Sequence, residues 1–80
     1  MNLPLTEKQT RILTLIRKSW VDFGYSPTRK ELSDGYYLKW KVTFSRQAID
    51  RHLFALKKKN YIRIDRKKGR RNIKIKNIKI

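Results

Sequence analysis

The sequence predicts a mainly α-helical fold that ends in a small β-hairpin, and three observations predict it. Apolar residues recur at helical spacing in three separate stretches, and each stretch follows a residue that commonly caps a helix N-terminus. Near the C-terminus, alternating apolar and polar residues flank a basic tip that contains a glycine. A length of 80 residues is enough for one domain, so we expect residues 1–80 to form a single module.

The first helix is expected at about residues 7–23. Thr6 and Gln9 have the spacing of a capping box, in which the two side chains satisfy each other's backbone amides. Gly24 supplies a residue suited to the left-handed conformation that often ends a helix. The residues of the predicted inward face lie three and four apart: Ile12, Leu13, Ile16, Trp20 and Phe23.

The second helix is expected at about residues 29–36. The stretch before it, GYSPTRKE at 24–31, combines a helix end, a turn and a helix start. Its proline cannot lie inside a helix, and Thr28 with Glu31 forms a second capping box. Two apolar residues four apart, Leu32 and Tyr36, give this helix its inward face.

Residues 37–44, YLKWKVTF, alternate apolar and polar side chains with the period of a strand, which predicts an extended or β-like segment. Two interpretations remain open for its apolar members. They either cover the core or bind a partner. The four residues concerned are Leu38, Trp40, Val42 and Phe44.

The third helix is expected at about residues 46–59, with Ser45 as its N-cap. Ile49, Leu53 and Leu56 form its buried stripe. The opposite face is polar and basic except for one phenylalanine, which either packs on the segment 37–44 or contacts a thymine methyl group. That face consists of Gln47, Asp50, Arg51, Phe54 and Lys58.

A β-hairpin is expected at about residues 61–76. YIRID and RNIKI alternate around the tip RKKGR, with Gly69 in the turn and Asn60 as a left-handed residue before the hairpin. The alternation changes phase after Ile75, so a bulge or strand end is expected near residues 76–77. Three helices followed by a basic antiparallel hairpin, the wing, is the order of a winged helix-turn-helix.

The charge of the chain points to a polyanionic partner. Its 22 Lys and Arg against 6 Asp and Glu give a formal net charge of +16. Residues 46–80 carry 14 of the basic and 2 of the acidic residues, which leaves +12 there. Nucleic acid is therefore the first expectation, ahead of an anionic membrane surface.

Other functions are disfavoured by what the sequence lacks. It has no cysteine, one histidine, no HExxH pair, no glycine-rich phosphate loop and no GxSxG motif, so we expect no enzyme, no metal site and no cofactor. No apolar stretch approaches the roughly 20 residues of a membrane span, and no signal peptide is evident. A cytoplasmic protein associated with the nucleoid is expected.

The third helix carries the side chains suited to reading bases. Gln47 can bridge N6 and N7 of adenine, and Arg51 can bridge O6 and N7 of guanine. Asp50 can accept from cytosine N4 or orient Arg46 or Arg51. Arg46, at the start of this helix, is itself a further base-reading candidate. The residues expected on the DNA backbone or in the minor groove come from the second helix, the third helix and the wing: Thr28, Arg29, Lys58, Arg66, Lys67, Lys68, Arg70 and Arg71.

Residues 5–33 and 45–64, with the pattern G-aromatic-x-P-T-R-x-E-L and a later H-L-x-A-L, resemble the DNA-binding domain of the LexA repressor family. The resemblance implies a winged helix-turn-helix that reads bases with five positions of the third helix, which here are Ser45, Gln47, Ala48, Asp50 and Arg51. Asp50 and Arg51 stand where the family usually has an acidic pair, so a different operator sequence is expected.

Two further differences from the family affect what the resemblance implies. The segment between the second and third helices is about five residues longer than the family's tight turn. LexA repressors also carry a self-cleaving, dimerising peptidase domain with a catalytic serine and lysine. The sequence contains no such domain, so induced self-cleavage is not expected of it.

Sequence-specific binding of double-stranded DNA by a small transcriptional regulator, a repressor rather than an activator, is the function that the sequence favours. One alternative is a double-stranded RNA or nucleoprotein binder. Another is a protein-interaction module of phage or plasmid origin that uses Trp40 and Phe44 against an unidentified protein. A weak homodimer, formed mainly on DNA or through residues 77–80, is also expected.

Overall fold

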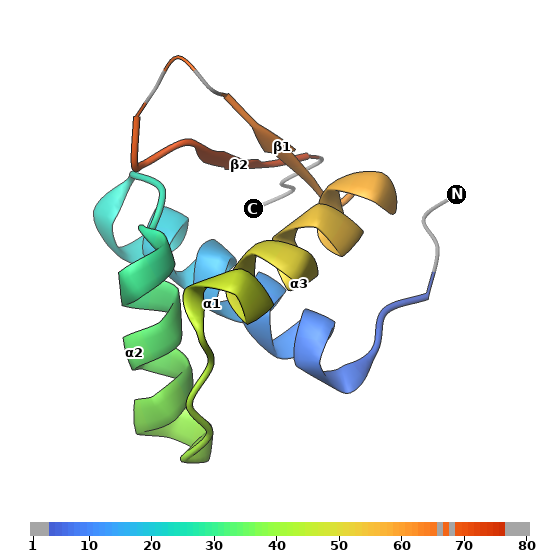
Figure 1. The fold of residues 1–80 in the computed structure, drawn as a ribbon. Coiled ribbons are helices and arrows are strands. Elements are labelled where there is room, and N and C mark those ends of the chain that lie inside the picture. The colour runs from blue at the N-terminus through green and yellow to red at the C-terminus, as the bar shows by residue number, and fades with distance from the viewer. Residues whose placement is uncertain (1–3, 66, 68, 77–80) are drawn as a thin grey trace.

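The computed structural model describes residues 4–65, 67 and 69–76, and it confirms the predicted fold class. Three helices precede a two-stranded antiparallel sheet, the wing, which lies above α3 and the first turn of α2 in Figure 1. The elements are α1 (Glu7–Phe23), α2 (Arg29–Trp40), α3 (Arg46–Lys58), β1 (Ile62–Ile64) and β2 (Ile73–Ile75).

Side-chain caps start all three helices. In the first capping box the Gln9 amide donates to Thr6 Oγ1 at 3.2 Å, and the Thr6 amide donates to Gln9 Oε1 at 3.1 Å. Thr28 and Glu31 form the second box in the same way, and Ser45 caps α3. Each cap satisfies amides that a helix start otherwise leaves without a partner, so the starts follow directly from the sequence.

The predicted end of the second helix was wrong, because α2 continues past residue 36 to Trp40. Trp40 lies one helical turn after Tyr36, and their ring centroids are 4.7 Å apart. Packing of these two aromatic side chains on the same helix face therefore outweighs the period-two alternation. The residue that caps the C-terminal end of α2 is Lys41, which has a left-handed φ of 59°.

Residues 41–45 run without regular secondary structure and return the chain to α3. Val42 and Phe44 are half-buried and pack on the core, as Trp40 does. The ring of Phe44 meets that of Tyr36 edge-on at 4.5 Å. Of the four apolar residues of the predicted segment 37–44, three thus cover the core, whereas Leu38 is 72% exposed.

The core forms where the three helices and the wing meet. Phe23 was predicted on the inward face of the first helix but is 65% exposed and stacks on Tyr25 instead. Burying an Ile or Leu side chain contributes about 1.5–3 kcal/mol, so the buried apolar residues of the core supply most of the stabilisation of the fold. The buried apolar residues are Ile12, Leu13, Ile16, Leu32, Tyr36, Ile49, Leu53, Leu56, Ile62 and Ile73.

The two strands pair with Ile62 opposite Ile75 and Ile64 opposite Ile73. The pairing continues to the end of the described wing, because the Lys76 amide donates to the Tyr61 carbonyl at 3.1 Å. The expected left-handed conformation occurs at Asn60, and Gly69, which was expected in the turn, also has a positive φ. The bulge or strand end expected near residues 76–77 lies partly outside the described residues.

The outer edge of β2 is attached to the helices by side chains. The indole N–H of Trp20 donates to the Ile73 carbonyl at 3.0 Å, and the Ile73 amide donates to Ser26 Oγ at 2.9 Å. Ser26 lies in the turn between α1 and α2 and is 2% exposed. These bonds satisfy polar groups of a strand edge and fix the wing relative to α1 and α2.

Candidate nucleic-acid interface

The N-terminal ends of α2 and α3 and the tip of the wing open into one groove of about 690 Å³. Five residues expected at a nucleic-acid site are brought together in it, three of them arginines. The predicted residues that line the groove are Thr28, Arg29, Arg46, Asp50 and Arg70. Lys30, Ser33, Asp34, Gly69 and Asn72 complete the lining.

Sequence reasoning missed four polar members of this lining, Lys30, Ser33, Asp34 and Asn72. A helical wheel of α2 could have indicated the first three, because residues 30, 33 and 34 are spaced three and four apart and share one face of the helix. Asn72 carries no comparable signal, since its position depends on how the wing folds back over α2.

The predicted polar face of α3 is exposed along its whole length. Gln47 and Arg51 point away from the core, and no described residue forms a hydrogen bond with either side chain. Ser45 is exposed, but its hydroxyl already accepts from the Ala48 amide at 3.1 Å. The exposed residues of α3 are Arg46, Gln47, Asp50, Arg51, Phe54, Lys57 and Lys58.

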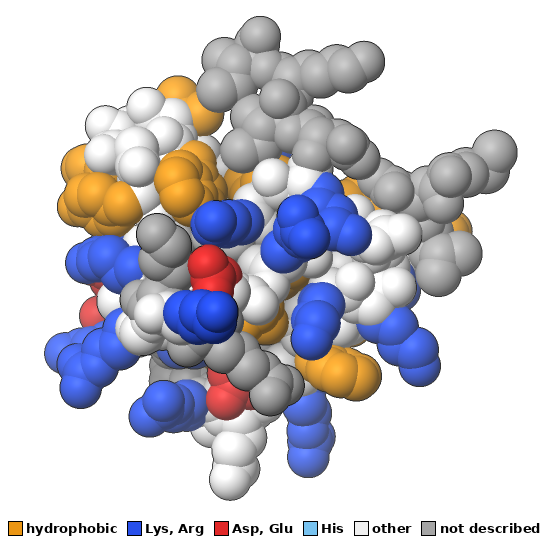
Figure 2. Space-filling model, turned by 90° about the horizontal axis from the view of Figure 1, so that it is seen from above, with side chains coloured by type: hydrophobic (Ala, Val, Ile, Leu, Met, Phe, Trp, Pro, Cys, Tyr) orange, Lys and Arg blue, Asp and Glu red, His pale blue; other side chains and the backbone are white. Residues whose placement is uncertain are grey.

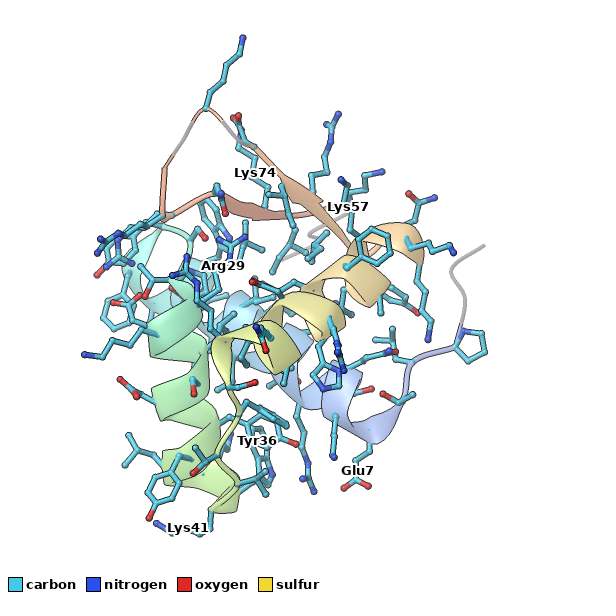
Figure 3. The ribbon with its side chains drawn as sticks, in the orientation of Figure 1. Glu7, Arg29, Tyr36, Lys41, Lys57 and Lys74 are labelled. Carbon is cyan, nitrogen blue, oxygen red and sulfur yellow. The ribbon has the colours of Figure 1, made fainter. Side chains whose placement is uncertain are left out.

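Arg29, labelled in Figure 3, lies at the start of α2 and contacts residues of α3 and the wing. Its Nε lies 3.5 Å from Asp50 Oδ1, and its Nη1 donates to Asn72 Oδ1. Asp50 therefore pairs with Arg29, and no ion pair among the described residues joins it to Arg46 or Arg51, which it was expected to orient if it does not accept from cytosine. The Arg29 side chain, which is 20% exposed, compensates part of the charge of Asp50, which is 53% exposed.

Arg71 was expected on the DNA backbone, but its partly exposed side chain is engaged in intramolecular contacts. Its guanidinium donates to both carboxylate oxygens of Glu31 at 2.8 and 2.9 Å and to the Ser26 carbonyl at 2.9 Å. It also lies 4.4 Å from the ring centroid of Tyr25. The pKa of Glu31 is lowered below its ordinary value of 4.5, mainly by the hydrogen bond from Arg71 and to a smaller extent by that from the Thr28 amide. This cluster holds the wing to α2.

The tip of the wing presents exposed cations. Lys67 and Arg70 are exposed, and the Lys67 amide donates to Asp65 Oδ1 at 3.1 Å within the turn. Arg66 and Lys68, also expected on the backbone, lie outside the described residues. On α3, Lys58 is exposed as expected.

Basic side chains dominate the face that includes the wing. Figure 2, seen from the side of the wing, shows Lys and Arg side chains spread over this face with few acidic side chains among them. Lys57 and Lys74, labelled in Figure 3, extend this basic surface from α3 to β2. A surface of one sign attracts polyanions over distances of about a Debye length.

None of the helices that the structure describes combines the length and the apolar character of a membrane-spanning segment. Nor are three or more His, Cys, Asp or Glu side chains grouped in the described part of the chain so that they could hold a metal ion.

The fold, the exposed polar face of α3 and the basic wing define the winged helix-turn-helix class of DNA-binding domains. Residues 2–71 match the family model described as the LexA DNA binding domain, and the chain belongs to this family.

Three relatives illustrate the similarity. The LexA repressor of Alcanivorax borkumensis is 37% identical over 71 residues, 86% of this chain and 32% of the relative. That of Shewanella denitrificans is 43% identical over 61 residues, 76% of this chain and 27% of the relative. That of Caldicellulosiruptor saccharolyticus is 39% identical over 70 residues, 88% of this chain and 32% of the relative. The chain thus spans about a third or less of the length of these relatives.

Proposed function

We propose that this chain binds double-stranded DNA with sequence specificity and acts as a transcriptional repressor. α3 enters the major groove, and the wing contacts the neighbouring backbone or minor groove. The observation that carries the proposal is the groove shared by the N-terminal ends of α2 and α3 and the wing tip, with Arg29, Arg46 and Arg70 in its lining. The names of the relatives support repression. The proposed activity is binding alone, in the cytoplasm where the nucleoid DNA lies.

Base reading falls to the N-terminal half of α3. Gln47 and Arg51 are exposed and keep their hydrogen-bonding groups available for adenine and guanine. Ser45 and Ala48 lie close to the DNA at the start of the helix, where Arg46 faces the groove. Asp50 can accept from cytosine N4 while Arg29 compensates its charge.

Backbone contacts come from the groove and the wing. The amides at the start of α2, beside Thr28, form a positive helix end that suits a phosphate. Lys58, Lys67 and Arg70 supply exposed cations, with Arg66 and Lys68 as further candidates in the wing sequence. Arg71 has a different role in this proposal, because its bonds to Glu31 position the wing.

Selection of bound duplexes from random DNA tests this function. We expect one sequence motif to be enriched, and the selected DNA duplex to bind more tightly than duplex RNA of the same sequence, whose deep, narrow major groove does not admit α3. A palindromic motif would indicate that two copies pair on DNA. Equal binding of duplex DNA and RNA, or no enriched motif, would contradict the proposal.

A further inference from the structure

Phe54 is an exposed apolar side chain in the middle of the polar face of α3. Its side chain is 62% exposed. It lies three residues after Arg51 and three before Lys57, both of which are exposed. At about 100° per residue, seven residues place it within about 20° of Gln47 around the helix. Phe54 therefore lies on the stripe that carries the proposed base-reading residues, between them and the cations of the last turn.

The protein itself gives Phe54 no aromatic partner among the described residues. The ring of Phe44, the nearest candidate on the 41–45 segment, lies 4.5 Å from the ring of Tyr36 and 5.4 Å from that of His52. No described ring contact joins Phe54 to an aromatic residue of the segment 37–44, so packing on that segment, one of the two alternatives left open by the sequence, is not supported. Core packing does not explain a phenyl group at this position.

The surroundings of Phe54 indicate the kind of group that would cover it. Arg51, Lys57 and Lys58 are exposed around it, so its partner is polyanionic and carries an apolar group within a groove. In the DNA major groove, the C5-methyl group of thymine is the apolar group that base edges present, and phenylalanine is among the side chains that contact it.

We propose that Phe54 determines specificity for thymine by packing against its C5-methyl group in the major groove. This inference rests on the proposed DNA-binding function and adds one base position to it. Phe54 lies about 4.5 Å further along the helix axis than Arg51. Since base pairs are spaced about 3.4 Å apart, the thymine lies one or two steps from the base that Arg51 contacts.

Replacing thymine by uracil removes the methyl group and leaves the hydrogen-bonding edges unchanged, so it isolates this contact. In the selected duplex, each thymine is replaced singly, and dissociation constants are measured for the wild-type chain and for Phe54→Ala. We expect the wild type to lose about threefold to fivefold in affinity at one or two positions. Phe54→Ala should bind the thymine and uracil duplexes equally at those positions.

Leu38→Ala is the matched control, because Leu38 is 72% exposed but lies on α2. It should keep the wild-type response to uracil at every position. Thermal unfolding should be nearly unchanged in both variants, since neither side chain is in the core.

Three outcomes would overturn the inference while leaving DNA binding intact. One is equal uracil sensitivity of the wild type and Phe54→Ala at all positions. Another is a selected site without thymine near the Arg51-dependent base. The third is loss of self-association in Phe54→Ala, seen by sedimentation, with an unchanged uracil profile, which would make Phe54 a protein contact. A wild type that enriches no duplex would overturn the proposed function and this inference together.

Discussion

At the scale of single residues, Arg29, Arg71 and Arg51 fall into two groups. Arg29 forms an ion pair with Asp50 and also contacts the wing. Arg71 forms an ion pair with Glu31 and also contacts the turn before α2. Arg51 is exposed and has no described partner. The first group orders the wing and α2, whereas the second is available for a ligand. Net charge alone does not distinguish these roles.

Arg51→Ala is expected to lower specificity before it lowers general affinity. Loss of a bidentate contact to guanine should cost about 1–3 kcal/mol at the selected site and flatten the preference at one base position. Competition between single-base variants of the selected duplex measures this. The control is Lys67→Ala in the wing, which should weaken selected and scrambled duplexes alike. The reverse pattern would show that α3 is not the reading element.

Ser26→Ala is expected to destabilise the fold because Ser26 Oγ accepts from the buried Ile73 amide. Leaving that amide without a partner should cost about 1–3 kcal/mol in the free energy of unfolding. Chemical denaturation measures the loss. Thr14→Ala, at an exposed position of α1, should change stability by less than about 0.5 kcal/mol. Equal stability of the two variants would mean that the wing does not depend on Ser26.

At the scale of elements, the helix starts and the hairpin were predictable because local chemistry determines them. Capping boxes at Thr6 and Thr28 and the alternation around Gly69 act over a few residues. The end of α2 was not predictable in this way, since it depends on aromatic packing of Trp40 and Phe44 against Tyr36. The period-two pattern of residues 38–44 arises from a helix end followed by an extended return.

The candidate site was predictable to a similar degree. The exposed face of α3 follows from its buried stripe of Ile49, Leu53 and Leu56. The internal role of Arg71 does not, because it requires the wing to bring Arg71 next to Glu31, 40 residues earlier in the chain. Sequence spacing carries no information about such a contact.

Lys41→Gly is expected to stabilise the protein. Lys41 ends α2 with φ of 59°, a conformation that costs a non-glycine residue about 1–2 kcal/mol. Glycine removes that cost but also the contact of the Lys41 ammonium with the Tyr37 ring, so we expect a net gain of about 1 kcal/mol. Lys39→Gly, inside the last turn, should instead lose about 0.5–1 kcal/mol. Thermal unfolding of both variants shows whether each substitution raises or lowers the stability of the protein.

The Glu31–Arg71 pair predicts a dependence of stability on acid pH. The folded-state pKa of Glu31 is lowered, so the unfolded chain binds the proton more readily. The stabilisation is therefore complete above about pH 4.5 and is lost as pH falls through the lower folded-state pKa. Because the carboxylate is 48% exposed, solvent screening limits the effect to less than about 1 kcal/mol.

Glu31→Gln should remove this acid-dependent part, and Arg71→Gln should reduce it to a similar extent. Urea denaturation at several pH values between about 3 and 6 measures the difference from the wild type. If the double variant loses no more unfolding free energy than either single variant, the two side chains act as a pair. An unchanged pH profile in Glu31→Gln would contradict this assignment.

At the scale of the whole molecule, a formal charge of +16 on 80 residues is combined with a small core and a wing fixed by side-chain bonds. In the proposed function, the charge attracts any duplex, and the exposed face of α3 discriminates between sequences. The same surface must then show two separable properties, a general affinity that salt weakens and a sequence preference that remains.

The salt dependence of affinity for the selected duplex and for a scrambled one tests this most directly. With about five to eight phosphate contacts, a plot of log affinity against log salt concentration should have a slope of about −4 to −7 for the selected duplex. The selected duplex should also bind more tightly at every salt concentration. A flat response, or equal affinities for the two duplexes across the titration, would contradict sequence-specific DNA binding by this protein.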